Sequence, residues 1–200
     1  MTASAPQELL YVSPMLLAPG SIIEPGNFGK NILGQNPTQG RNGWPVVREL
    51  IFDQVRFFTA PHLPSRLHCN FLFTSTAAAL HGGQELATEV LSPCIYNVEI
   101  TDPEAPQCMG DFDTLKTIDE NHFISSTHAV ATAYWHAAAT NNLREGCLPE
   151  LLTASPIRIL RRASYQPHIL VLPTIRIAPP KDLSSPPQSS LVHQDSEQPS

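Results

Sequence analysis

The sequence predicts an α+β domain, because segments typical of strands and segments typical of helices occur together in one chain of moderate length. Leu9–Val12 and Asn70–Phe73 are short apolar runs, typical of buried strands and too short to indicate helices. Residues 93–100 alternate as a half-buried strand does. Val46–Phe58 instead carries apolar residues at helical spacing.

Composition limits the number of domains and the kinds of partner. The chain has 200 residues, 42% of them hydrophobic, which is enough for one domain with a sizeable core. We expect this domain over 9–177, between a disordered N-terminus over 1–8 and a disordered Pro/Ser-rich tail over 178–200. The formal net charge of −6 argues against nucleic-acid binding, because no long basic stripe offsets it.

Neither a membrane nor a metal ion is predicted as a partner. No apolar run approaches the roughly 20 residues that span a bilayer. The first residues lack the basic-then-apolar pattern of a signal peptide, so we expect a cytoplasmic location or delivery by a route that needs no cleaved signal. The 4 cysteines are widely spaced and form no Cys-x-x-Cys pair, which predicts reduced, mostly buried thiols. The acid-rich segment 103–121 lacks the full pattern of a calcium loop and is predicted to be a solvated loop.

The first helix follows a long segment with Pro-Gly turns, which we interpret as loop up to residue 45. The helix over 46–58 is expected to bury one apolar face and to leave its charged side chains in solvent. The predicted buried face consists of Val47, Leu50, Ile51, Val55 and Phe58. The predicted solvated charges are Arg48, Glu49, Asp53 and Arg56, with an ion pair between Arg56 and Asp53 as one option.

The stretch 67–80 contains the most informative local pattern. The strand over 70–73 runs into the hydroxyls of Thr74-Ser75-Thr76, and a helix is predicted over 76–90. Thr74 or Ser75 can cap this helix, either as an ordinary strand-to-helix turn or as a place that holds an anionic or ribose-bearing ligand. Arg66, just before the strand, is either a plain surface arginine or a cation within reach of that ligand.

The second half of the chain contributes an alternating strand over 93–100, a helix and further strands. Ser125-Ser126-Thr127 is predicted to cap a helix over 129–139. Glu150 begins a β-rich segment, with further strands expected at 157–160, 169–172 and 175–177. Glu150 is open to two interpretations, as a surface carboxylate at a strand start or as a catalytic acid.

Four pieces of the sequence occur in a characteristic order. They are Leu10-Tyr11-Val12 before a Pro-Gly loop, Arg48-Glu49 with Phe52, Arg56 and Pro64-Ser65-Arg66, the strand Ile95-Tyr96-Asn97-Val98, and Ala133-Tyr134-Trp135 before Glu150-Leu151-Leu152. Taken in this order, they resemble the pattern of the ADP-ribosyltransferase superfamily, and more closely that of the bacterial DUF2441 family of unknown function. The resemblance implies a split, strongly bent β core with flanking helices and NAD in the cleft between two small sheets.

The resemblance also implies an activity and a set of site residues. It implies that NAD is a substrate and that ADP-ribose, a glycosyl group, is transferred to an unidentified acceptor, a protein or a small molecule. By order, Glu150 and Ser75 are the catalytic candidates. The residues implied to bind NAD are Tyr11, Arg66, Thr74, Thr76 and Tyr96.

A carboxylate is needed in such a site because cleavage of the nicotinamide–ribose bond passes through an oxocarbenium-like state. The sequence departs from the superfamily pattern at two points. No His or Arg stands beside Tyr11, and Leu148 occupies the place of the second acid of arginine-modifying members. Either the acceptor is not arginine, or Glu150 is not the catalytic acid and Glu145 or Asp102 serves instead. The competing hypotheses are a non-catalytic nucleotide- or protein-binding module that retains the fold, and an interaction protein that uses its tail.

Overall fold

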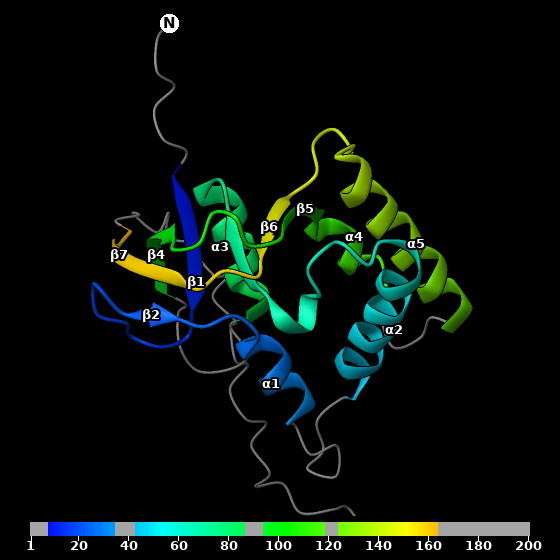
Figure 1. The fold of residues 1–200 in the computed structure, drawn as a ribbon, viewed down its shortest axis with the longest axis horizontal. Coiled ribbons are helices and arrows are strands. Elements are labelled where there is room, and N and C mark those ends of the chain that lie inside the picture. The colour runs from blue at the N-terminus through cyan, green and yellow to red at the C-terminus, as the bar shows by residue number, and fades with distance from the viewer. Residues whose placement is uncertain (1–7, 35–42, 87–93, 119–123, 164–200) are drawn as a thin grey trace, which may run out of the picture. The chain divides into compact units, whose positions relative to one another are not determined.

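The computed structural model describes residues 8–34, 43–86, 94–118 and 124–163, which form an α+β unit built on one antiparallel sheet (Figure 1). In sheet order the strands are β2 Ile22–Ile23, β7 Ile157–Arg162, β4 Cys94–Ile100, β1 Leu9–Ser13, β3 Asn70–Phe73, β6 Pro149–Thr153 and β5 Gln107–Asp111. The predicted α+β class is confirmed. The implied division into two small sheets is not, because hydrogen bonds join all seven of these strands.

Helices occupy the connections between the strands. They are α1 Asn27–Leu33, α2 Trp44–Thr59, the short 3-10 helix η2 Arg66–His68, α3 Thr76–Leu86, α4 Phe112–Lys116 and α5 Ile124–Thr140. Two of them, α2 and α5, pack against each other and bury a shared apolar cluster with β6 (Figure 1). Within the described residues, no helix combines the length and apolar character needed to cross a bilayer.

Strand alternation divides the core between the two faces of the sheet. On β1, Leu10 and Val12 pack with α3, whereas Tyr11 packs with a second cluster that includes Tyr96 and Leu72. Strand β4 is buried from Cys94 through Val98, so it lies inside on both faces. The half-buried strand predicted from its alternation is therefore present, but its second face is also covered.

The buried face of α2 differs from the predicted one. Three residues assigned to that face, Val47, Leu50 and Phe58, are 41%, 48% and 74% exposed. The helix instead turns Phe52 inward, where its carbonyl accepts a hydrogen bond from Trp135 Nε1 at 2.7 Å. The prediction placed Glu49 in solvent because it is charged, but Glu49 lies on the buried face of α2. The face that packs is therefore not the face with the most apolar side chains.

The structure differs from some of the local predictions and confirms others. The loop expected before residue 45 contains α1, the acidic loop expected over 103–121 contains β5 and α4, and Ser125–Thr127 lie inside α5 rather than before it. Ser75 does cap α3, because its hydroxyl accepts from the Ala78 amide at 3.2 Å. All four cysteines are free, and three are buried, as predicted.

Some predictions concern residues that the structure does not describe. The N-terminus up to residue 7, the strands expected at 169–172 and 175–177, and the tail over 178–200 lie outside the described residues. The end of the helix predicted over 76–90, beyond Leu86, does so as well.

Candidate functional site

A buried network of charged and polar side chains is centred on Arg66. The Arg66 side chain is only 3% exposed, and its Nε lies 3.0 Å from Glu49 Oε2. Its Nη1 donates to the hydroxyl of Tyr134 at 2.9 Å and forms an ion pair with Glu150 Oε1. Four elements, α2, η2, α5 and β6, thereby converge on one guanidinium.

Local sequence explains how Arg66 is aimed inward. Ser65 caps η2, because its hydroxyl oxygen accepts from the Leu67 amide at 3.2 Å. The same hydroxyl donates to Asp53 Oδ1 at 2.6 Å, which ties η2 to α2. The guanidinium then lies 4.7 Å from the ring centroid of Phe71, within the range of a cation–π contact. The capped turn therefore directs the arginine into the core.

Glu150 reaches the network from β6, which lies between β3 and the edge strand β5. It pairs with Phe73 of β3 on one side and with Gly110 of β5 on the other. Its side chain is 1% exposed, and Oε1 also accepts from the Tyr134 hydroxyl at 3.0 Å. A Cβ at position 110 would meet that same hydroxyl, so glycine there allows Tyr134 to reach across β5 to Glu150.

The arginine and the tyrosine of the network both keep their protons at neutral pH. Burial by itself lowers the pKa of Arg66, but the Glu150 and Glu49 carboxylates outweigh burial and hold that pKa well above its usual value. Burial raises the pKa of Tyr134 well above its usual value despite the opposing charge of Arg66. Arg48 Nη2 closes the outer end of the network, 3.1 Å from Glu49 Oε1. Two arginines thus balance two glutamates.

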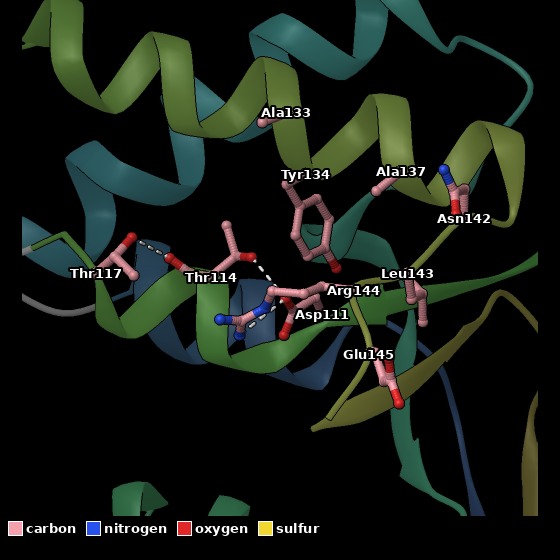
Figure 2. Close-up of a pocket in the computed structure, with 10 residues that line it drawn as sticks. All are labelled: Asp111, Thr114, Thr117, Ala133, Tyr134, Ala137, Asn142, Leu143, Arg144 and Glu145. Atoms are coloured by element: carbon pink, nitrogen blue, oxygen red, sulfur yellow. Dashed lines mark hydrogen bonds and ion pairs between the residues drawn. The ribbon is translucent and has the colours of Figure 1, made fainter. Parts of the chain in front are cut away.

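A cavity of about 670 Å³ opens beside this network, between α4, α5 and the segment 141–145 (Figure 2). Its volume lies within the roughly 300–1,000 Å³ typical of ligand pockets. Tyr134 belongs to both features, because it lines the cavity while its hydroxyl is held by Arg66 and Glu150. The polar residues that line the cavity include Asp111, Thr114, Asn142, Arg144 and Glu145.

Asp111 is the buried carboxylate of the cavity and is 5% exposed. It caps α4, because Oδ1 accepts from the Asp113 amide at 3.0 Å, while Oδ2 accepts from the Thr114 hydroxyl at 3.0 Å. Figure 2 shows the Arg144 side chain lying across it. Arg144 Nη2 is 3.5 Å from Asp111 Oδ2 and 3.7 Å from Asp113 Oδ2, and the Arg144 side chain is 66% exposed.

The structure brings some of the predicted site residues together and separates others. Arg66 and Glu150 are in direct contact. Thr74 immediately follows Phe73, the β3 partner of Glu150, and Ser75 and Thr76 are exposed at the start of α3. Tyr11 and Tyr96 pair with each other across β1 and β4 and pack on the face of the sheet opposite Glu150.

The two tyrosines on that opposite face have structural surroundings. The Tyr96 hydroxyl accepts from the Leu17 amide at 2.9 Å and donates to the Met15 carbonyl at 3.2 Å. It therefore fastens the segment after β1 to the sheet. Burial raises the pKa of Tyr11 above its usual value.

Three sequence interpretations need correction. Glu49 was predicted to be a solvated helix charge, but it is fully buried because Arg66 and Arg48 supply counter-charges in the interior. The interpretations of Arg66 as a plain surface arginine and of Glu150 as a surface carboxylate are also wrong, since both are buried. Of the alternative acids, Glu145 lines the cavity, whereas Asp102 is exposed.

Three residues of the Arg66 network and the cavity are not predicted as site residues from the sequence. Tyr134 is a large aromatic residue in an alanine-rich helix, which was a signal that one side of that helix packs closely. Asp111 stands two residues before Asp113 and three before Thr114, a spacing suited to a helix cap. Arg144 carried no recognisable signal, because it follows the helix in a polar segment.

Fold and site together define an α+β protein with a buried ionic network beneath one side of an antiparallel sheet and an open cavity next to it. The model of a family described as protein of unknown function (DUF2441) matches residues 36–164, more than half of the chain. The chain belongs to this family, as its resemblance predicted. The matched range includes Arg66, Tyr134 and Glu150 but not Tyr11. No curated protein matches the sequence.

Proposed function

We propose that this protein is an ADP-ribosyltransferase-like protein that binds NAD and uses Glu150 as its catalytic acid to transfer ADP-ribose to a cytoplasmic acceptor. One observation carries the proposal. The three strands that hold or precede the implied motif positions, β1, β3 and β6, are consecutive in the sheet. Leu10 pairs with Phe73, and Phe73 pairs with Glu150, so Thr74 and Glu150 lie on or next to one row of the sheet, whereas Tyr11 follows Leu10 in that row but faces the opposite side of the sheet.

The chemistry requires an ionised carboxylate close to the ribose. In the transfer, the bond from ribose C1′ to nicotinamide breaks, nicotinamide leaves with the electron pair, and an acceptor nucleophile bonds to C1′ and loses a proton. Positive charge develops on the ribose, and a preorganised carboxylate stabilises it. Because Glu150 is 1% exposed, Tyr134 has to move off Glu150 before a ribose can approach it.

A second candidate function is a non-catalytic module that binds a nucleotide or a partner without turnover. It is favoured by the state of Glu150, whose Oε1 is already engaged by both Arg66 and Tyr134 in the interior. A carboxylate neutralised by an adjacent guanidinium gives less stabilisation to a developing cation. Fold alone does not decide between the two functions.

The deciding experiment measures NAD binding and nicotinamide release separately. NAD at 100 times its dissociation constant should stabilise the protein by about 2.7 kcal/mol, which thermal unfolding detects. Release of nicotinamide, followed by chromatography, should be lost in Glu150→Gln and kept in the matched variant Glu145→Gln. Binding without release supports the non-catalytic module instead. The absence of both binding and release in the wild-type protein overturns the NAD proposal.

The role of the hydroxyl group of Ser75 can be tested without disturbing the helix. Ser75 caps α3, so Ser75→Ala would change stability as well as any ligand contact. Ser75→Asn keeps a good cap and removes the hydroxyl. Weaker NAD binding at unchanged stability would assign Ser75 to the ligand, whereas unchanged binding would leave it as a helix cap only.

A further inference from the structure

The cavity between α4 and α5 has the chemistry of a cation site. We propose that it binds a small organic cation with a guanidinium or primary ammonium group, that Asp111 is the counter-ion, and that the Arg144 guanidinium is an internal cation which the ligand displaces. This inference concerns a site formed by residues other than those implied to hold NAD, and it stands whether or not NAD binds.

The charge of Asp111 is incompletely neutralised within the protein. Its carboxylate is 5% exposed and receives two neutral donors, the Asp113 amide and the Thr114 hydroxyl. Its cationic partner, Arg144, stands 3.5 Å away, beyond the 2.7–2.9 Å typical of charge-assisted hydrogen bonds. A buried carboxylate with so distant a counter-charge attracts a better-placed cation.

Arg144 holds Asp111 less closely than the guanidinium group of a bound ligand could. The Arg144 side chain is 66% exposed and divides its contacts between Asp111 and Asp113, at 3.5 Å and 3.7 Å. The arginine of this pair is exposed and its contacts are long, so displacing it has a small cost once a ligand cation takes its place beside Asp111. A ligand guanidinium inside the cavity can present two parallel N–H groups to the carboxylate, the favourable geometry for this pair.

The shape and charge of the cavity lining also favour a small cation. Ala133 and Ala137 lie one turn apart on α5 and line the cavity with their small side chains, on either side of Tyr134, which extends from the same helix (Figure 2). Glu145 adds a second carboxylate to the lining. Two acids against one displaceable arginine disfavour ligands that carry phosphate groups, so the cavity is suited to a cation rather than to a dinucleotide.

The test uses butylguanidinium as the probe and butylurea as its neutral counterpart of the same shape. Calorimetric titration at low ionic strength should show saturable binding of butylguanidinium, with butylurea at least tenfold weaker. Asp111→Asn should weaken butylguanidinium binding at least tenfold, and folding is protected because Asn is also a good helix cap. Arg144→Ala should tighten binding severalfold, because it removes the competing internal cation.

Two further variants test the location. Ala137→Leu fills the cavity and should abolish butylguanidinium binding, while Ala139→Leu, on the exposed surface of the same helix and outside the cavity, should leave it unchanged. NAD binding measured on Ala137→Leu separates this site from the proposed nucleotide site. The inference is overturned if neither wild type nor Arg144→Ala binds butylguanidinium, if Arg144→Ala weakens binding, or if butylurea binds equally well.

Discussion

Arg66 and Arg144 each face two carboxylates, yet the two arginines serve opposite purposes. The Arg66 side chain is 3% exposed and lies between Glu49 and Glu150 in the core. Arg144 is 66% exposed and lies over Asp111 and Asp113 at the mouth of the cavity, with longer contacts of 3.5 Å and 3.7 Å. The difference shows that burial and distance, not the pairing of charges, decide whether an arginine holds a fold together or can give way to a ligand.

The largest change in the free energy of unfolding is expected when the buried Arg66 is removed. Arg66→Ala leaves Glu49 and Glu150 in the interior without their shared counter-charge, and removing one partner of a buried ion pair costs about 3–5 kcal/mol. Urea unfolding at neutral pH should show a loss of that size in the free energy of unfolding. The matched control is Arg158→Ala, because Arg158 and Glu99 form an ion pair that is about half exposed on each side. A loss below about 1 kcal/mol, the range of surface ion pairs, would mean that Arg66 contributes no more to stability than an exposed arginine does.

A smaller loss is expected at the residue shared by the network and the cavity. Tyr134→Phe removes a hydroxyl that accepts from Arg66 and donates to Glu150, so both groups lose a buried partner. Leaving a buried polar group unsatisfied costs about 1–3 kcal/mol. Thermal or urea unfolding measures this loss. Tyr11→Phe is the control, because the Tyr11 hydroxyl makes no hydrogen bond to the residues that the structure describes, and its effect should stay within about 0.5 kcal/mol.

The free energy of unfolding at high pH should depend on the buried thiol of Cys108, which is influenced by Glu150. Burial, with Glu150 adding to it, raises the pKa of Cys108 from 9.0 to about 12. Between these values the folded protein keeps a proton that the unfolded chain has lost, so the thiol's contribution is complete below about pH 9 and declines as pH rises toward 12. Stability should therefore fall over this window, and Cys108→Ser should make the fall less steep. An equal slope in wild type and variant would exclude the thiol as a cause.

The elements that sequence predicted best are those whose signal is local. The runs at Leu9 and Asn70 are strands, and the Ser75 cap follows from neighbouring residues alone. Arg66 and Glu150 were both chosen as site residues, and they meet, but their contact joins positions far apart in the chain. No local pattern encodes such a contact.

The missed features have a common physical cause, which is that charged residues were assigned to solvent. Glu49 stands next to Arg48 on a helix and looks like a surface pair, but its partner Arg66 lies on another element and draws it inside. Asp111 belongs to an acid-rich segment that resembles a loop, whereas its carboxylate ends β5 and caps α4. A tertiary partner therefore brings Glu49 inside, whereas Asp111 is held by cap donors two and three residues further along the chain.

The smallest change in the free energy of unfolding is expected at the exposed Arg144. Arg144→Ala should change the free energy of unfolding by no more than about 0.5 kcal/mol, because the Arg144 side chain is 66% exposed, its contacts are long, and the Asp111 carboxylate keeps its two cap donors. The same variant is expected to tighten binding of butylguanidinium, so stability and affinity should separate at this residue. Urea unfolding and calorimetry on one preparation measure both. A loss of 2 kcal/mol or more, at about the scale of a buried group, would mean that Arg144 supports the fold as Arg66 does.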